Sequence, residues 1–290
     1  MRIGELSRRS GVSPQLLRTW ERRYGLLRPV RTPGGFRLYG LEDEDRVRRM
    51  RERIAAGFPA AAAARLVLAE PGRPAPPPDS APAELRARLL EAALAYDEPA
   101  ADALLDRVLA AFTLDTALGE VVVPLLSDLG SRWERGEVTI AQEHFVTNLV
   151  RGRLLALARG WGDGAGPRAL LACAPEEQHD LPLICFGLAL RARGWRITFL
   201  GANTPVTTLA EAADALGPRL VVLAAVDAGR LRGLAAELAP LARRHPLALA
   251  GPGAGPALAR DLGALLLHEP PARAAARVAA DLGAAPASSG

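Results

Sequence analysis

Apolar positions recur with different spacings along the chain and divide it into three parts. Residues 1–70 contain short helical patterns, residues 84–166 contain longer helical stripes, and residues 167–286 contain apolar runs of strand length between helical stretches. Residues 71–83 include the sequence PGRPAPPPDSAP, which cannot form a helix and is expected to be a semi-rigid linker. We therefore expect one small domain, a linker and two further domains.

The last part alternates strand and helix signals. Its apolar runs of strand length are residues 169–174, 195–200, 220–225, 247–250 and 264–267. Its helical stretches are residues 183–193, 206–216, 231–244, 256–262 and 272–282. Strands joined by crossover helices predict a doubly wound parallel sheet, and such sheets bind ligands outside the carboxyl ends of their strands.

The middle part is predicted to be an antiparallel four-helix bundle. Its apolar stripes lie at residues 85–94, 101–112, 116–135 and 139–161. Thr139 and Gln142 form a capping-box pattern at the start of the fourth helix, directly after the turn that ends the third.

The first part has the order helix, turn, helix and hairpin. Ser13 and Pro14 are a typical helix start, and the helix that follows is expected to point Leu16, Leu17 and Trp20 inward. The turn residues 33–35, Pro-Gly-Gly, predict a short hairpin or wing, and another helix is expected at residues 41–56. The whole chain is thus expected to be multidomain, with α and α/β domains.

The charge of the chain is concentrated in its first part. Residues 1–73 contain 16 arginines and eight acidic residues, whereas the whole chain has a net charge of only +4. A basic N-terminal module indicates a polyanionic partner, because neutralising phosphates releases counterions. The chain has no lysine, which excludes P-loop kinases, Schiff-base enzymes and receiver domains, whose chemistry needs that side chain.

The composition also bears on the compartment. Cys173 and Cys185 lie in apolar segments, so we expect no disulfide framework. No apolar run approaches the ~20 residues that a membrane-spanning helix needs, and three arginines lie where a signal peptide would be apolar. We expect a cytoplasmic protein without a membrane partner.

A candidate metal ligand, His179, lies in the loop PEEQHDLP after the first predicted strand of the sheet. Glu177 precedes it by two residues, and metal-bound imidazoles commonly donate their second N–H to a carboxylate. We therefore predict that His179 coordinates a metal carried within a cofactor.

A second candidate site lies at the turn between the third and fourth bundle helices. Trp133 ends one helix, and Glu143 and His144 lie in the first turns of the next. Each residue also has an ordinary explanation, since Trp133 can be a core residue, Glu143 can favour the helix dipole and His144 can be a surface residue.

The first part resembles the DNA-binding domain of the MerR family, in the stretch IGELSRRSGVSPQLLRTWERRYGLLRPVRTPGGFRLYG. The resemblance implies double-stranded operator DNA as partner and binding as a dimer. It also implies that Gln15 and Arg18 face the major groove, and that the phosphates are held by Arg22, Tyr24, Arg37 and Tyr39. The alternative is a set of solvated arginines on a small helical module.

The last part resembles cobalamin-binding domains of the methionine-synthase type. Their first loop reads Asp-x-His-x-x-Gly, and the stretch from Glu177 to Pro182 keeps the acid and the histidine but ends in proline. The resemblance implies that His179 is the lower cobalt ligand and that Gly251 and Gly253 let the nucleotide tail pass close to the backbone. The family's serine after the third strand is missing, since that position is Ala224.

Nearly the whole chain resembles the CarH and LitR type of cobalamin-dependent photoreceptor repressors. That family has a tryptophan, nine residues and then Glu-His around the upper adenosyl group, which Trp133, Glu143 and His144 match. The resemblance implies a light-responsive repressor in which adenosylcobalamin between bundle and sheet domain controls a homo-oligomer, a dimer or a tetramer. A histidine directly after the family's tryptophan captures cobalt in light, and here that residue is Glu134.

Two other functions remain open from the sequence. One is a light-independent sensor of a corrinoid or another tetrapyrrole, with an additional linear tetrapyrrole as a weaker possibility. The other is a corrinoid-dependent mutase or methyltransferase subunit. The DNA-binding pattern and the absence of a substrate barrel count against an enzyme.

Overall fold

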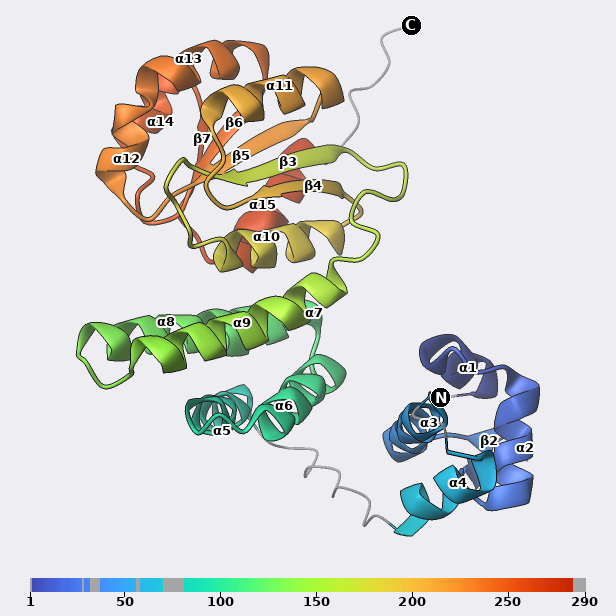
Figure 1. Cartoon of the computed structure of the whole chain (residues 1–290). Helices are drawn as coiled ribbons and strands as arrows, with labels where there is room; N and C mark the ends of the chain where they lie inside the picture. The colour runs from blue at the N-terminus through green and yellow to red at the C-terminus, as the bar shows by residue number, and fades with distance from the viewer. Residues whose placement is uncertain (1, 28, 32–36, 56–57, 70–80, 284–290) are drawn as a thin grey trace, which may run out of the picture. The chain divides into compact units, whose positions relative to one another are not determined.

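The computed structural model describes residues 2–27, 29–31, 37–55, 58–69 and 81–283 and divides into two compact units, Met1–Ser80 and Ala81–Gly290 (Figure 1). The linker predicted at residues 71–83 falls mostly outside the described residues, as does the turn at residues 33–35. Within the described ranges, no helix combines the length and apolar character needed to cross a membrane.

The first unit is a helix-turn-helix with a short antiparallel hairpin. Its elements are α1 (Ile3–Ser10), α2 (Pro14–Tyr24), β1 (Val30–Arg31), β2 (Arg37–Leu38), α3 (Leu41–Ala55) and α4 (Ala60–Ala69). Ser13 caps α2, since its hydroxyl accepts a hydrogen bond from the Leu16 amide at 3.3 Å. Helix α4 was not predicted from the sequence.

The prediction that Leu16 points inward is wrong. Leu16 is 42% exposed, whereas Leu17 and Trp20 are buried in the core of the unit. Consecutive residues of a helix point about 100° apart, so the narrow face of α2 that meets the core admits Leu17 and not its neighbour.

The second unit begins with the bundle. Its segments are α5 (Pro82–Leu94), α6 (Glu98–Ala111), α7 (Leu114–Thr116), η1 (Ala117–Val122), α8 (Val123–Glu134) and α9 (Ile140–Leu157). The third predicted helix is continuous through α7, η1 and α8, but η1 is a π-helical turn that the sequence pattern did not predict.

Pro124 gives a physical reason for this π-helical turn. Proline lacks the N–H that would donate to the carbonyl of Glu120 four residues earlier, and its ring would clash with that carbonyl in an α-helix. The wider π-helical turn relieves the clash. Arg86 of α5 donates a hydrogen bond to the Glu120 carbonyl at 3.0 Å.

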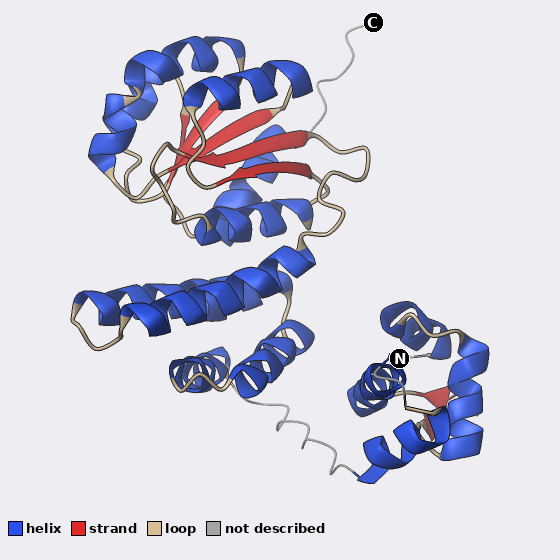
Figure 2. Ribbon diagram, viewed as in Figure 1, coloured by secondary structure: helices blue, strands red, loops and turns tan. Residues whose placement is uncertain are grey.

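The remainder of the second unit is a five-stranded parallel sheet with the order β4-β3-β5-β6-β7 (Figure 2). The strands are β3 (Arg168–Cys173), β4 (Arg196–Gly201), β5 (Leu220–Ala224), β6 (Leu247–Ala250) and β7 (Leu265–Leu267). The helices are α10 (Leu181–Arg191), α11 (Val206–Leu216), α12 (Ala228–Gly233), α13 (Ala235–Arg244), α14 (Pro256–Leu262) and α15 (Pro271–Leu282).

The strands and helices of this sheet domain follow the sequence prediction closely, with one difference. The single helix expected at residues 231–244 is two helices, because Asp227 starts α12 earlier by accepting the Arg230 amide at 2.7 Å. Gly233 ends that helix, and the chain turns at Leu234 before α13 begins.

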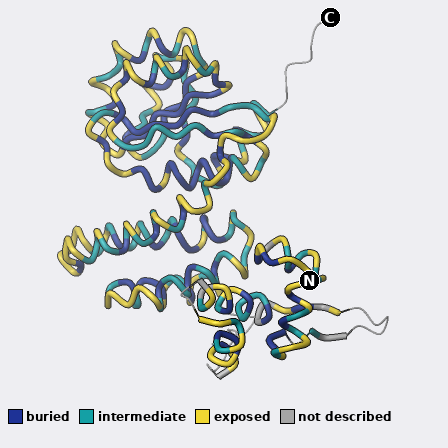
Figure 3. The backbone as a smooth tube through the Cα atoms, turned by 45° about the vertical axis from the view of Figure 1, so that its right-hand side comes forward, coloured by how far each residue is buried: buried dark blue, intermediate teal, exposed yellow. Residues whose placement is uncertain are grey.

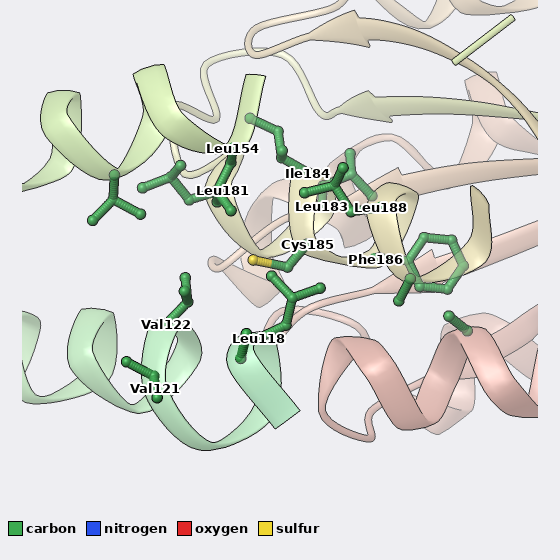
Figure 4. Close-up of a cluster of buried hydrophobic side chains, with 14 of the residues drawn as sticks. Leu118, Val121, Val122, Leu154, Leu181, Leu183, Ile184, Cys185, Phe186 and Leu188 are labelled. Atoms are coloured by element: carbon green, nitrogen blue, oxygen red, sulfur yellow. The ribbon is translucent and has the colours of Figure 1, made fainter. Parts of the chain in front are cut away.

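Bundle and sheet domain share one hydrophobic core. Helices α10 and α15 cover one face of the sheet, and the other face is covered by α11, α13 and α14 (Figure 1). Residues 183–190 of α10 are all buried, as expected for a helix that packs on the sheet on one side and on the bundle on the other (Figure 3). Figure 4 shows Leu118 and Val122 of η1 facing Cys185 of α10 across this contact.

The two cysteines, Cys173 and Cys185, are free and buried. Burial raises the pKa of both thiols to about 12, so they are small core residues and poor nucleophiles.

Candidate functional site

The first candidate site lies where the strand order of the sheet reverses. Strand β3 is followed in the chain by β4 on one side, and the next strand, β5, lies on the other side. The crevice outside the carboxyl ends of such a strand pair is the usual ligand site of doubly wound folds. His179 lies in the loop between β3 and α10, and its side chain is 70% exposed.

Glu177 is buried beneath this histidine and is fully hydrogen bonded. Its side chain is 1% exposed. Oε1 accepts the His179 amide at 3.0 Å and contacts His179 Nδ1 at 2.6 Å. Oε2 accepts the Val226 amide at 2.8 Å and Arg230 at 3.0 Å.

These contacts fix the protonation of Glu177. Burial by itself raises the pKa of the carboxyl, but the hydrogen bonds from the Val226 and His179 amides and from the His179 ring lower it to about 2. An ionised carboxylate only accepts hydrogen bonds, so Nδ1 of His179 is the nitrogen that donates to Glu177, and in the neutral ring Nε2 is then the nitrogen with the lone pair.

An exposed imidazole with a fixed tautomer fits a metal whose other positions are filled by a macrocycle. Nε2 is the atom that would bind such a metal, and Glu177 would orient it. Within the residues that the structure describes, no three His, Cys, Asp or Glu side chains are grouped to hold a metal ion.

Gly251 and Gly253, after β6, pack against the backbone of the loop after β5. A Cβ at residue 251 would lie 2.6 Å from the Ala225 carbonyl oxygen, and one at residue 253 would lie 2.6 Å from the Asp227 carbonyl oxygen. Gly251 also has φ +88°. These glycines therefore allow two loops at the carboxyl edge of the sheet to touch, and a role in passing a nucleotide tail stays a prediction.

The second candidate site lies at the turn between α8 and α9. The capping box is present as predicted, with the Thr139 hydroxyl accepting from the Gln142 amide and the Gln142 side chain accepting from the Thr139 amide. His144 contacts Glu143 at 2.6 Å through Nδ1, and its side chain is 70% exposed. Trp133 is 50% exposed, which is unusual for so large an apolar side chain.

An ion pair connects the two candidate sites. Arg151 of α9 contacts Asp180, the residue after His179, and the Asp180 side chain is 4% exposed. His144 and Arg151 are seven residues apart, so they lie on one face of α9, about 10 Å apart along its axis. The α8–α9 turn therefore lies at the same end of the second unit as the carboxyl ends of the strands, as Figure 1 shows.

The residues predicted to bind DNA fall into two groups. Gln15, Arg18 and Arg22 are exposed on α2, and Tyr24 is half-buried at its end. Arg37 is exposed on β2, where it pairs with Glu21 at 3.0 Å.

Tyr39, unlike the exposed residues of α2, lies in the core of the first unit. Its side chain is 2% exposed, and its hydroxyl donates to Glu21 at 2.7 Å. Burial, together with the Glu21 carboxylate, raises its pKa to about 12. In the structure Tyr39 therefore anchors the end of β2 to α2, and its role in holding a phosphate stays a prediction.

Three residues of the site were missed by sequence reasoning, namely Arg151, Asp180 and Arg230. Arg230 lies 53 residues from Glu177 and Arg151 lies 29 residues from Asp180. No local pattern connects residues so far apart, although an acid directly after His179 was visible in the sequence.

Comparison with known families agrees with this architecture. Residues 1–70 match the MerR HTH family of regulatory proteins, and residues 85–158 match a B12 binding domain. The chain therefore carries a MerR-type DNA-binding module and a B12 binding domain. The Methanosarcina barkeri monomethylamine corrinoid protein has a similar fold, with a TM-score of 0.56 and 19% identity over 68% of this chain and 98% of that chain.

Two relatives from Myxococcus xanthus match across most of the chain. The HTH-type transcriptional repressor CarH is 40% identical over 234 residues, which cover 78% of each chain. The HTH-type transcriptional repressor CarA is 33% identical over 231 residues, which cover 79% of this chain and 77% of the relative. Both relatives are named as transcriptional repressors of the HTH type. The chain therefore belongs to the CarH and CarA family, the B12-dependent transcriptional repressors of MerR type.

Proposed function

We propose that this repressor responds to light through adenosylcobalamin bound between the bundle and the sheet domain. The cofactor controls the oligomeric state, a dimer or a tetramer, and thereby the affinity for operator DNA. The single observation that supports this most strongly is the exposed His179 ring, held at Nδ1 by a buried, ionised Glu177. In this proposal His179 is the lower cobalt ligand.

The α8–α9 turn supplies the residues for the other side of the cofactor. Trp133 and His144 are exposed at the end of the unit where His179 lies, and Glu143 is held by Thr147, whose hydroxyl donates to it at 2.8 Å. In the proposal these three residues, Trp133, Glu143 and His144, surround the adenosyl group. Bound adenosylcobalamin supplies a cobalt–carbon bond that green or blue light breaks.

The signal reaches the DNA through the arrangement of the domains. Loss of the adenosyl group would remove a contact of Trp133 and His144 that would favour one packing of α9 against the sheet domain. A ligand stabilises only the arrangement that it binds better, so its loss shifts the population of oligomers. The paired N-terminal modules then bind a palindromic operator less tightly. In this proposal Gln15 and Arg18 face the major groove of the operator, and its phosphates are held by Arg22, Tyr24 and Arg37.

A second candidate function is favoured by Glu134. This carboxylate follows Trp133 directly and is a weaker partner for cobalt than the imidazole that photoreceptor repressors have at this position. The alternative is a repressor that senses a corrinoid or another tetrapyrrole without using light. An additional linear tetrapyrrole belongs to this alternative, and it would add a far-red absorption band.

The test compares dark and illuminated holo-protein. The full chain is loaded with adenosylcobalamin in darkness, and a palindromic operator is selected from random DNA with the dark protein. Absorption spectrum, sedimentation and operator affinity are then measured before and after green light. His179→Gln is the test variant, and His245→Gln is the matched control. His245 lies directly after α13, outside the candidate sites, and its Nε2 is hydrogen bonded to Asp214 at 2.7 Å.

We expect illumination to change the mass and to weaken operator binding, and we expect only His179→Gln to weaken the binding of the corrin. Equal mass and affinity in dark and light would refute the use of light. If corrinoid loading alone then changed operator affinity, the second candidate would replace the first. A His179→Gln variant that retains the corrin as firmly as the parent would refute the proposed ligand.

A further inference from the structure

The buried carboxylate of Glu177 depends on a residue that lies outside the loop of His179. Its two oxygens face different partners, because Oε1 is bonded to His179 and Oε2 is bonded to the segment after β5. A carboxylate that is 1% exposed needs both oxygens satisfied, since an unpaired buried charge is costly. The orientation of Glu177 is therefore set as much by the second partner group as by the first.

Arg230 is the side-chain donor in that second group. Ala224 and Ala225 at the end of β5 have methyl side chains, so this strand end offers only backbone donors, of which the Val226 amide reaches Oε2 at 2.8 Å. Arg230 adds the other hydrogen bond at 3.0 Å together with a positive charge. Its side chain is 28% exposed, so the guanidinium is held against the buried carboxylate while part of it still faces solvent.

The local fold explains how Arg230 reaches this position. Asp227 accepts the Arg230 amide at 2.7 Å and so starts α12, which places Arg230 in the first turn of that helix. The loop that carries Asp227 is also held by its close approach to Gly253, whose backbone packs against the Asp227 carbonyl. The position of the guanidinium is thus defined by the backbone of two loops at the carboxyl edge of the sheet.

We propose that Arg230 is a positioning residue for the His179 ligand, acting through Glu177. By holding Oε2 it prevents the carboxylate from rotating, and the carboxylate in turn keeps the His179 ring in the pose and tautomer that present Nε2. This inference extends the proposed function, because it assumes that His179 binds the cobalt of a corrin. Arg230 itself touches neither the metal nor the corrin.

The first test detects directly whether a protein nitrogen is bound to cobalt as its axial ligand. The probe is cobinamide, the corrin without its nucleotide base, so an axial nitrogen on cobalt must come from the protein. Electron paramagnetic resonance of the Co(II) form, bound to the full chain, reports that nitrogen by its hyperfine splitting. Arg230→Ala removes the contact, Arg230→Lys keeps the charge, and Arg232→Ala is the matched control because Arg232 is exposed on the same helix.

A second readout needs no metal. In the apoprotein, nitrogen NMR of the His179 ring, assigned with His179→Gln, distinguishes the Nδ1–H tautomer from the Nε2–H tautomer. We expect a single Nδ1–H tautomer in the parent and in Arg232→Ala, and a mixture in Arg230→Ala. A residue that only stabilised the fold would leave this ratio unchanged in the folded protein, as monitored by circular dichroism.

We expect Arg230→Ala to lower the affinity of the axial nitrogen for cobalt by about 10-fold or more, the range usual for residues that orient metal ligands. Arg230→Lys should restore part of the loss. A parent with axial nitrogen and an Arg230→Ala variant equal to it in both readouts would overturn this inference alone. A parent without axial nitrogen would overturn the proposed function, and this inference with it.

Discussion

The ion pair between Arg151 and Asp180 should contribute measurably to the stability of the second unit. The Asp180 side chain is 4% exposed and that of Arg151 is 31% exposed. The second oxygen of Asp180, Oδ1, is buried as well and has no hydrogen-bond partner within the described residues. Replacing Arg151 by methionine keeps an apolar stem of similar length but removes the charge that compensates this buried carboxylate.

The expected cost follows from the burial of the two partners. Breaking a fully buried ion pair by removing one partner costs about 3–5 kcal/mol, and a hydrogen bond to a charged group contributes about 1.5–3 kcal/mol. Because Arg151 is partly exposed, water can replace some of the contact, and we expect Arg151→Met to lower the free energy of unfolding by about 2–3 kcal/mol.

A surface pair on α8 provides the matched control. The side chains of Arg132 and Asp128 are 39% and 42% exposed. Exposed pairs contribute at most about 1 kcal/mol, so Arg132→Met should have little effect. The two substitutions are chemically identical and differ only in the burial of the acid that they leave unpaired.

The measurement is urea unfolding of the full chain, followed by the fluorescence of its tryptophans. Three of the four tryptophans, Trp133, Trp161 and Trp195, lie in the second unit and report its transition. A double-mutant cycle with Asp180→Asn isolates the pair. We expect the double variant to be more stable than the sum of the single effects predicts. Equal losses in Arg151→Met and Arg132→Met, with additive effects in the cycle, would show that the buried pair contributes no more than a surface pair.

Three further predictions concern the second unit. Gly253→Ala should destabilise it by about 1–3 kcal/mol, because the new Cβ would lie 2.6 Å from the Asp227 carbonyl oxygen; an unchanged urea midpoint would contradict this. Gln142→Ala should cost about 1 kcal/mol, measured in the same way, because it removes the side-chain half of the capping box of α9 and the hydrogen bond to the Leu94 carbonyl, and a loss below about 0.3 kcal/mol would count against that role. Hydrogen bonds from Arg277 lower the pKa of Glu269 to about 2. The contribution of Glu269 to the free energy of unfolding is therefore complete above the ordinary carboxyl pKa, and it is lost as the pH falls toward 2. Glu269→Gln should therefore flatten the acid limb of the stability curve between about pH 4.5 and 2, and a limb as steep as the parent's would exclude this pair as its source.

Much of the fold could be predicted because its elements are local patterns. The strands β5 and β6 and the helices α11 and α14 lie within a residue of their predicted bounds. An apolar run bounded by turn residues can satisfy its backbone and bury its side chains in only a few ways, so pattern and length identify the element. The capping box at Thr139 was equally readable, since all its atoms belong to four consecutive residues.

Parts of the candidate site could also be predicted, namely its residue types and their spacing. A histidine two residues after an acid, in a loop after an apolar strand, is a local signal, and the structure joins His179 to Glu177 at 2.6 Å. The burial of Tyr39 and the exposure of Leu16 were not predictable in the same way. Both depend on which side of α2 the hairpin and α3 cover, and the helical pattern alone does not specify this.

The pattern of side chains was enough to define the order of the elements, the parallel sheet and the loop that carries His179, because those depend on hydrophobic periodicity and turn chemistry within short stretches. Only the folded chain decided that Arg230 reaches Glu177, that Arg151 pairs with Asp180 and that Pro124 follows a π-helical turn. The first two contacts join residues from separate elements, and the pair of Arg151 and Asp180 lies where packing of α9 on α10 buries apolar surface that neither helix can bury alone.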